Sequence, residues 1–144
     1  MTHVDTLVLF DHMAEEMNAH PALFEALGDL HLDLVCVIHG PGGSDRIRLT
    51  FEGIRCVGVV PVKESDEWEA DCRLEGDVAA WAGMFADIRD HGGADGLHTL
   101  NSLTLLGDRI RLTGSDPMGV DKFHRYNQTL QEFFDGAARV PVEA

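Results

Sequence analysis

The chain has 144 residues, a length typical of one domain with its own hydrophobic core. Its 25 acidic and 11 basic residues give a formal charge of −14, which repels nucleic-acid phosphates and anionic lipid surfaces. The three cysteines lie in apolar or alternating segments, as reduced thiols do, so we expect a cytoplasmic protein. A basic leader and an apolar run near the ~20 residues of a membrane span are both missing, so we expect neither secretion nor a transmembrane anchor.

Two helices are predicted within residues 5–28. Apolar residues that include Phe10 and Met17 recur at helical spacing, with acidic residues on the other faces. Pro21 suits the first turn of a short second helix, and Gly28 is placed to end it.

The middle of the chain has the alternation of β-strands. Ile47 and Phe51 would lie on one face of a strand, with Arg46 and Arg48 on the other, as expected when one face is buried. The glycine-rich residues 40–45 before it read as a hairpin turn. Strands are predicted at 32–39, 46–52, 54–60 and 68–75.

The last third mixes helix and strand signals. From Val78 to Ile88 apolar residues recur with a period near 3.6, which predicts a helix over the sheet. Residues 100–106 and 109–113, joined by a Gly-Asp turn, predict a hairpin. Asp116 is a good N-cap with proline after it, so a C-terminal helix is expected over 117–135.

These elements give the order α-α-β-β-β-β-α-β-β-α, without an internal repeat or a linker between domains. Amphipathic helices need an apolar surface to cover, and a sheet with one apolar face provides it. We therefore expect an α+β fold with two layers, in which helices cover a mostly antiparallel sheet of five to six strands. Residues 1–144 would form a single domain.

Three segments together resemble the sterol carrier protein 2 (SCP2) sterol-binding domain. They are the helical N-terminus leading into three strands, the strand-turn-helix of residues 68–81 that ends on Trp81, and the glycine-flanked strand of residues 106–114. The resemblance spans about residues 20–135. It implies a five-stranded sheet and helices that enclose an apolar tunnel for sterols, fatty acids or fatty acyl-CoA, with no catalytic residue. The extra strand at 100–106, the acidic surface and the missing lysine cluster near the C-terminus depart from the family pattern.

Nine apolar residues of the later helices and strands would line such a tunnel, since ligand pockets are mostly hydrophobic and aromatic. They are Trp81, Met84, Phe85, Ile88, Ile110, Leu112, Phe123, Leu130 and Phe134. The alternative is that these residues pack against one another as a solid core, because any surface helix shows such a stripe.

Few polar residues are placed where burial is expected. Asp33 lies in an apolar strand and Asn127 on the inner helical stripe, where each would fix a ligand's polar end or satisfy backbone groups. Arginines of neighbouring strands, among them Arg48, would either collect an anionic head group or pair with acidic residues such as Glu69.

Metal binding is not indicated, although the chain has eight histidines. His12 and Glu16 are one helical turn apart, but a metal site needs at least one further ligand from elsewhere. We therefore expect neither a metal nor another cofactor.

The leading hypothesis is a non-catalytic binding or carrier protein for a hydrophobic small molecule such as a lipid, a fatty acyl group or a sterol. A second hypothesis is a cyclase or isomerase of the nuclear-transport-factor-2-like class, with Asp33 or His98 as the proton-transfer group. A third is an accessory subunit whose groove receives an enzyme partner. A homodimer through the exposed face of the sheet also stays open.

Overall fold

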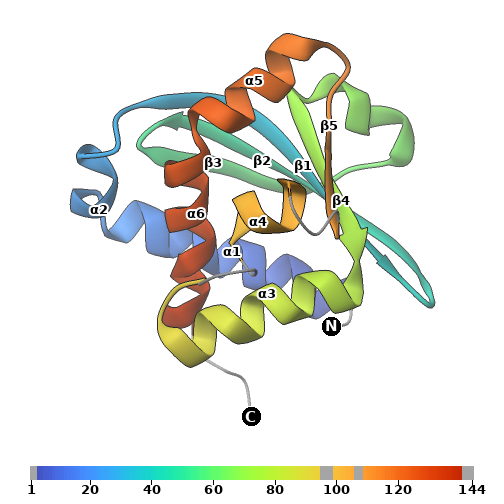
Figure 1. Cartoon of the computed structure of the whole chain (residues 1–144), viewed down its shortest axis with the longest axis horizontal. Helices are drawn as coiled ribbons and strands as arrows, with labels where there is room; N and C mark the ends of the chain where they lie inside the picture. The colour runs from blue at the N-terminus through green and yellow to red at the C-terminus, as the bar shows by residue number, and fades with distance from the viewer. Residues whose placement is uncertain (1–2, 95–98, 106–108, 141–144) are drawn as a thin grey trace.

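The computed structural model describes residues 3–94, 99–105 and 109–140. Figure 1 shows the elements in chain order, with a sheet on one side and most of the helices on the other. The elements are α1 (His3–Ala19), α2 (Ala22–Glu25), β1 (Leu30–Gly40), β2 (Gly43–Gly53), β3 (Arg55–Pro61), the 3-10 helix η1 (Glu64–Glu69), β4 (Cys72–Asp77), α3 (Val78–His91), α4 (Leu100–Leu105), β5 (Ile110–Thr113), α5 (Pro117–Arg125), α6 (Asn127–Asp135) and the 3-10 helix η3 (Gly136–Arg139).

The five strands form one sheet in the order β3-β2-β1-β4-β5. Three of the four pairings are antiparallel, and β1 with β4 is the parallel one. The parallel pair requires a crossover from β3 back to the centre of the sheet, and η1 belongs to that crossover. The expected α+β fold with a mostly antiparallel, helix-covered sheet is confirmed.

The central strand β1 is buried on both faces. Leu34 and Cys36 face the main core under the helices, whereas Val35 and Val37 pack on the opposite face against Ala70. This explains why the sequence of β1 is a nearly continuous apolar run. In β2, which has one solvent-exposed face, apolar and polar residues alternate.

Helix ends follow the expected capping chemistry. The Asp77 carboxylate accepts a hydrogen bond from the Ala80 amide at 2.7 Å, and the Asp116 carboxylate accepts one from the Gly119 amide at 3.1 Å. Each cap satisfies an amide that the first helical turn leaves without an intrahelical partner. Gly92, at φ 78°, ends α3 in a left-handed conformation that favours glycine.

The strand predicted over 68–75 is too long, because β4 begins at Cys72 and residues 64–69 form η1. The alternation placed Ala70 and Cys72 on the same face. In the structure Ala70 packs against the outer face of β1 and Cys72 belongs to the main core. The chain changes faces between them, which a run of alternating residues does not reveal.

The extra strand predicted over 100–106 is wrong for residues 100–105, since Leu100–Leu105 is helix α4. Residue 106 and the predicted Gly-Asp turn after it lie outside the described residues. Leu100 and Leu103, three residues apart, are both buried, and the Gln131 side chain of α6 accepts a hydrogen bond from the Leu100 amide at 2.8 Å. Tertiary packing thus overrides the local strand preference. The strand over 110–113 pairs with β4 instead.

The C-terminal helix predicted over 117–135 is divided into α5 and α6. Tyr126 lies between them with φ −102° and ψ 15°, outside helical geometry. Figure 1 shows the resulting change of direction: α5 packs against β4, whereas α6 turns toward α1.

Candidate functional site

The nine residues predicted to line a tunnel all meet in the space between the sheet and the helices. Eight of them are no more than 3% exposed, and Leu112 is half-buried at the margin of the same core. The eight are Trp81, Met84, Phe85, Ile88, Ile110, Phe123, Leu130 and Phe134. The structure therefore joins stripes from α3, β5, α5 and α6 into one apolar region, while the tunnel itself remains a prediction.

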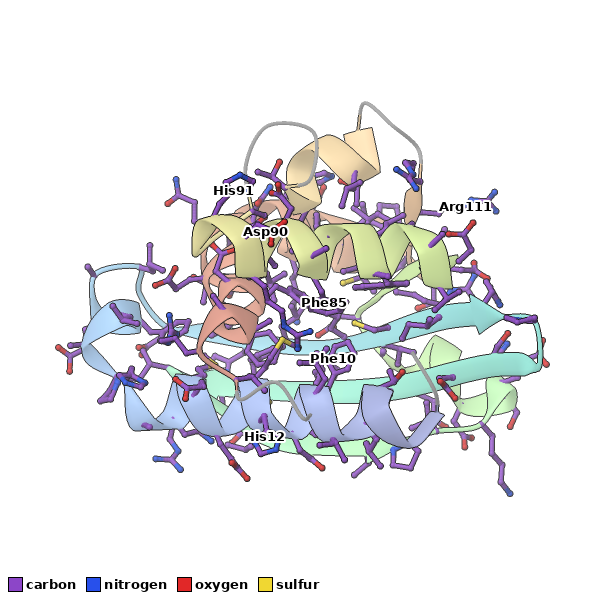
Figure 2. All side chains as sticks on the ribbon, turned by 90° about the horizontal axis from the view of Figure 1, so that it is seen from below. Phe10, His12, Phe85, Asp90, His91 and Arg111 are labelled. Atoms are coloured by element: carbon purple, nitrogen blue, oxygen red, sulfur yellow. The ribbon has the colours of Figure 1, made fainter. Side chains whose placement is uncertain are left out.

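Four aromatic rings form the centre of this region. The centroid of the Phe10 ring lies 6.4 Å from Trp81, 6.2 Å from Phe85 and 6.0 Å from Phe134. The contacts of Phe10 are edge-to-face, the geometry that aromatic quadrupoles favour. Figure 2 shows Phe10 and Phe85 pointing toward each other between α1 and α3, with His12 turned outward.

Phe10 is absent from the nine predicted residues, because the tunnel was assigned to the later helices alone. The helical stripe of α1 already contained the signal, since Phe10, Met13 and Met17 are all fully or almost fully buried. What the sequence does not contain is the position of α1 relative to α3.

The core is almost entirely apolar. Among the described residues, the buried polar or charged ones are Thr6 and Thr129. Trp81 donates its indole N–H to the carbonyl oxygen of Val37 at 3.1 Å, so this buried polar atom is satisfied by β1. Any ligand in this region would be held by shape and apolar contact.

Asp33 does not lie in this core, contrary to the expectation of burial there. Its side chain is 33% exposed on the opposite face of the sheet, where it accepts a hydrogen bond from Thr50 at 2.9 Å and pairs with Arg48 at 3.1 Å. Side chains alternate between the two faces of a strand, so Asp33 points away from Leu32 and Leu34. The nearly continuous apolar run of β1 hid which face Asp33 would occupy. Asn127 is half-buried at the start of α6.

A polar depression of about 240 Å³ lies beside Asp33. Asp71 connects two sides of this depression. Its carboxylate accepts a hydrogen bond from the backbone amide of Asp33 at 2.9 Å and pairs with Lys122 of α5 at 3.2 Å. Arg48 is committed to Asp33 and, at 3.9 Å, to Glu69. The structure thus shows Arg48 paired with acidic side chains, which was the predicted alternative to a site for an anionic head group.

The histidine and the carboxylate of α1 considered as metal ligands, His12 and Glu16, each contact other side chains. His12 contacts Glu15 at 3.4 Å, whereas Glu16 contacts His20 and Arg139. No three histidine, cysteine or carboxylate side chains among the described residues are grouped to hold a metal ion. His98 lies outside the described residues.

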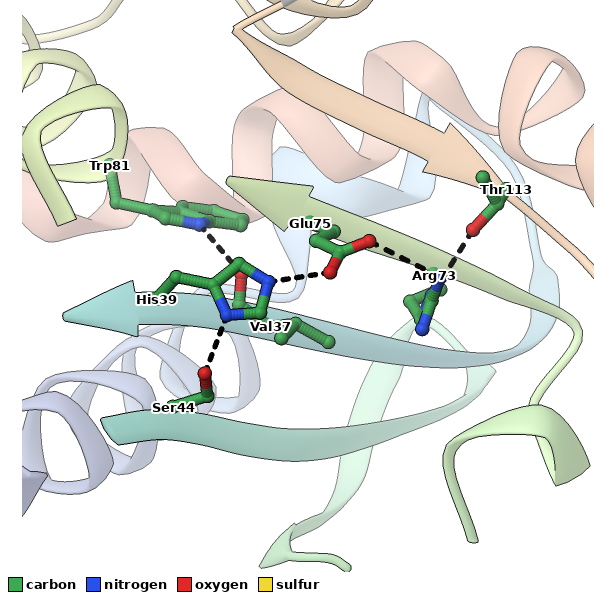
Figure 3. A network of polar contacts seen from close by, with 7 residues as sticks. All are labelled: Val37, His39, Ser44, Arg73, Glu75, Trp81 and Thr113. Carbon is green, nitrogen blue, oxygen red and sulfur yellow. Dashed lines mark hydrogen bonds and ion pairs between the residues drawn. The ribbon is translucent and has the colours of Figure 1, made fainter. Parts of the chain in front are cut away.

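A second polar network lies at the other end of the sheet's outer face (Figure 3). His39 contacts Ser44 through Nδ1 and Glu75 through Nε2, both at 2.5 Å. Arg73 pairs with Glu75 at 3.2 Å and donates to Thr113 at 3.1 Å. The hydrogen bond from His39, followed by the charge of Arg73, lowers the pKa of Glu75 against the opposing effect of burial.

The three thiols are buried and behave as small apolar groups. Burial raises the pKa of Cys56 to about 11 and that of Cys72 to about 12, and raises the pKa of Cys36 well above its usual value. Thiols are nucleophilic only as thiolates, so none is suited to covalent chemistry at neutral pH.

None of the helices in the described part of the chain is both long and apolar enough to cross a membrane.

Comparisons with known proteins identify the architecture. Neither a family model nor a curated protein matches the sequence. A crystal structure of sterol carrier protein 2 superposes with a TM-score of 0.70 at 18% identity, covering 93% of this chain and 96% of the other. The solution structure of a conserved hypothetical protein from Thermus thermophilus superposes with a TM-score of 0.69 at 19% identity, covering 94% and 88%. The chain therefore has the fold of sterol carrier protein 2.

Proposed function

We propose that residues 1–144 form a single domain that binds or carries a hydrophobic small molecule, such as a lipid, a fatty acyl group or a sterol, in the cytoplasm. The observation that carries this proposal is the apolar region between sheet and helices. Side chains from every major helix converge there, and the likeness to sterol carrier protein 2 supports the same assignment. Pockets for apolar ligands have this aromatic and aliphatic composition.

The composition of the region suits a ligand of variable shape. Met13, Met17 and Met84 are fully or almost fully buried in it, and methionine has three rotatable bonds and a polarisable sulfur. Such side chains rearrange around a guest at small cost. The absence of charged residues from the buried set of the described chain favours a ligand whose buried part is uncharged.

The cyclase or isomerase alternative finds no support in the described residues. Its proposed acid, Asp33, lies on the outer face of the sheet and is held by Arg48 and Thr50. A carboxylate in that environment has no access to a molecule within the apolar region, where a proton-transfer group would have to act.

The test is native mass spectrometry of the freshly purified protein, followed by solvent extraction and titration with a fluorescent fatty acid. We expect a bound lipid or saturable binding, and we expect Met84→Trp to weaken it by filling the region. Met118→Trp is the matched control, since Met118 is 75% exposed and its replacement should leave binding unchanged. The absence of any bound or binding lipid, with the fold intact by circular dichroism, would refute the proposal.

A further inference from the structure

The outer face of the sheet carries a serine, a histidine and a glutamate in one hydrogen-bonded line. His39 and Ser44 are cross-strand partners flanking the glycine-rich turn between β1 and β2, so their side chains lie on the same face. Glu75 reaches the same face from β4, whose parallel pairing places it opposite Val37, two residues from His39. The three side chains thus come from three strands of the sheet, not from a single flexible loop.

The charge of Glu75 settles which ring nitrogen carries the proton. An ionised carboxylate only accepts hydrogen bonds, so the 2.5 Å contact requires His39 Nε2 to be the donor. In the neutral imidazole, Nδ1 then has a free lone pair, and it faces the Ser44 hydroxyl at 2.5 Å. This is the arrangement of a nucleophile, a base and a group that orients the base.

Further contacts hold the orienting group in place. Arg73 is mostly buried, pairs with Glu75 at 3.2 Å and is itself fixed by a hydrogen bond to Thr113. Glu75 therefore keeps both its charge and its position when the imidazole becomes protonated. Ser44 in turn is exposed, and a side chain added at Gly42 or Gly43 would meet nothing within 4 Å. A small molecule can approach the hydroxyl from that side.

We infer that Ser44, His39 and Glu75 form an acyl-transfer site for small, activated carboxylic esters, separate from the apolar region on the other face of the sheet. Ser44 Oγ attacks the ester carbonyl carbon while its proton passes to His39 Nδ1. The bond from that carbon to the leaving oxygen then breaks, and the departing alcohol takes the proton from His39.

Water completes the reaction on the acylated serine. It attacks the acyl carbon and gives a proton to His39 Nδ1, and the Ser44 oxygen leaves and recovers that proton. The products are a carboxylic acid and an alcohol, so neither an oxidant nor a co-reactant besides water is needed. Glu75 stabilises the imidazolium in both steps.

The experiment is covalent labelling with diisopropyl fluorophosphate, with the modified residue located by peptide mass spectrometry. We expect Ser44 to be labelled about a hundredfold faster than Ser65, an exposed serine of η1, because a positioned base contributes roughly 10²–10⁴-fold. Ser44→Ala should abolish this labelling and Ser65→Ala should not change it. His39→Gln should reduce it to the rate of an ordinary serine.

Glu75→Gln distinguishes the site from a merely structural network. Glutamine accepts the same hydrogen bond from Nε2 but lacks the charge, so the variant should fold normally and lose most of the labelling rate and of p-nitrophenyl acetate turnover. Labelling of Ser44 no faster than of Ser65, or a Glu75→Gln rate equal to that of the wild type, would overturn the inference.

Discussion

Gly119 should not tolerate alanine, although it lies in a helix where alanine normally stabilises. A Cβ at this position would lie 1.7 Å from the carbonyl oxygen of Asp71 and 2.7 Å from its carbonyl carbon. Both atoms are backbone, so no side-chain rotation relieves the overlap. To restore ordinary contact, α5 must move away from the start of β4 by on the order of 1.5 Å.

The cost follows from what that movement disturbs. Overpacking costs roughly 1–3 kcal/mol, and the N-cap between Asp116 and the Gly119 amide is worth about 1 kcal/mol. The higher helix propensity of alanine offsets about 1 kcal/mol of this loss of stability. We expect Gly119→Ala to lower the free energy of unfolding by about 1–3 kcal/mol, and Tm by roughly 3–12 °C in a chain of this length.

Gly83→Ala is the matched control, because Gly83 lies within α3 and an added Cβ there meets nothing within 4 Å. It should raise the stability by about 0.5–1 kcal/mol. Both variants are measured by urea unfolding followed by circular dichroism. If Gly119→Ala is as stable as the wild type, or if both substitutions change stability in the same direction, the close contact between α5 and β4 does not exist as described.

Three further measurements test other parts of the structure. Asn18→Ala should cost about 2 kcal/mol in urea unfolding, because the Asn18 amide donates to the Cys56 carbonyl at 2.9 Å and accepts from its amide at 3.0 Å, and both backbone groups lose that partner. The buried thiols, Cys56 and Cys72 among them, should react with Ellman's reagent at pH 7 only after unfolding; rapid reaction of the native protein would contradict their raised pKa values. The pKa of Glu75 is lower in the folded than in the unfolded chain, chiefly through the hydrogen bond from the imidazole, so its stabilisation is present above about pH 4.3 and is lost as the pH falls through the folded value. The stability difference between the wild type and Glu75→Gln should therefore shrink from pH 6 to pH 3, and a difference that grows on acidification would reverse the assigned sign.

Local sequence patterns were enough to predict the elements whose burial leaves a regular period. β2 alternates because one face is wet, and α3 shows a helical stripe because only one side is covered. Asp77 and Asp116 marked helix starts, since capping is a local interaction. These local signals were sufficient to predict an α+β fold and the membership of eight tunnel candidates in the buried core.

Features that depend on contacts between distant segments could be seen only in the folded chain. Residues 100–105 became helical through burial and a hydrogen bond to Gln131, against their local preference. Asp33 faces outward because of its position in β1, between the core-facing Leu32 and Leu34. Since β1 is covered on both faces, its sequence lacks the alternation that would have shown this. The turn predicted over 40–45 hid the pairing of His39 with Ser44, because β1 extends to Gly40 and β2 begins at Gly43. Glu75 joins them only through the parallel pairing of β1 with β4, for which the sequence carries no local signal.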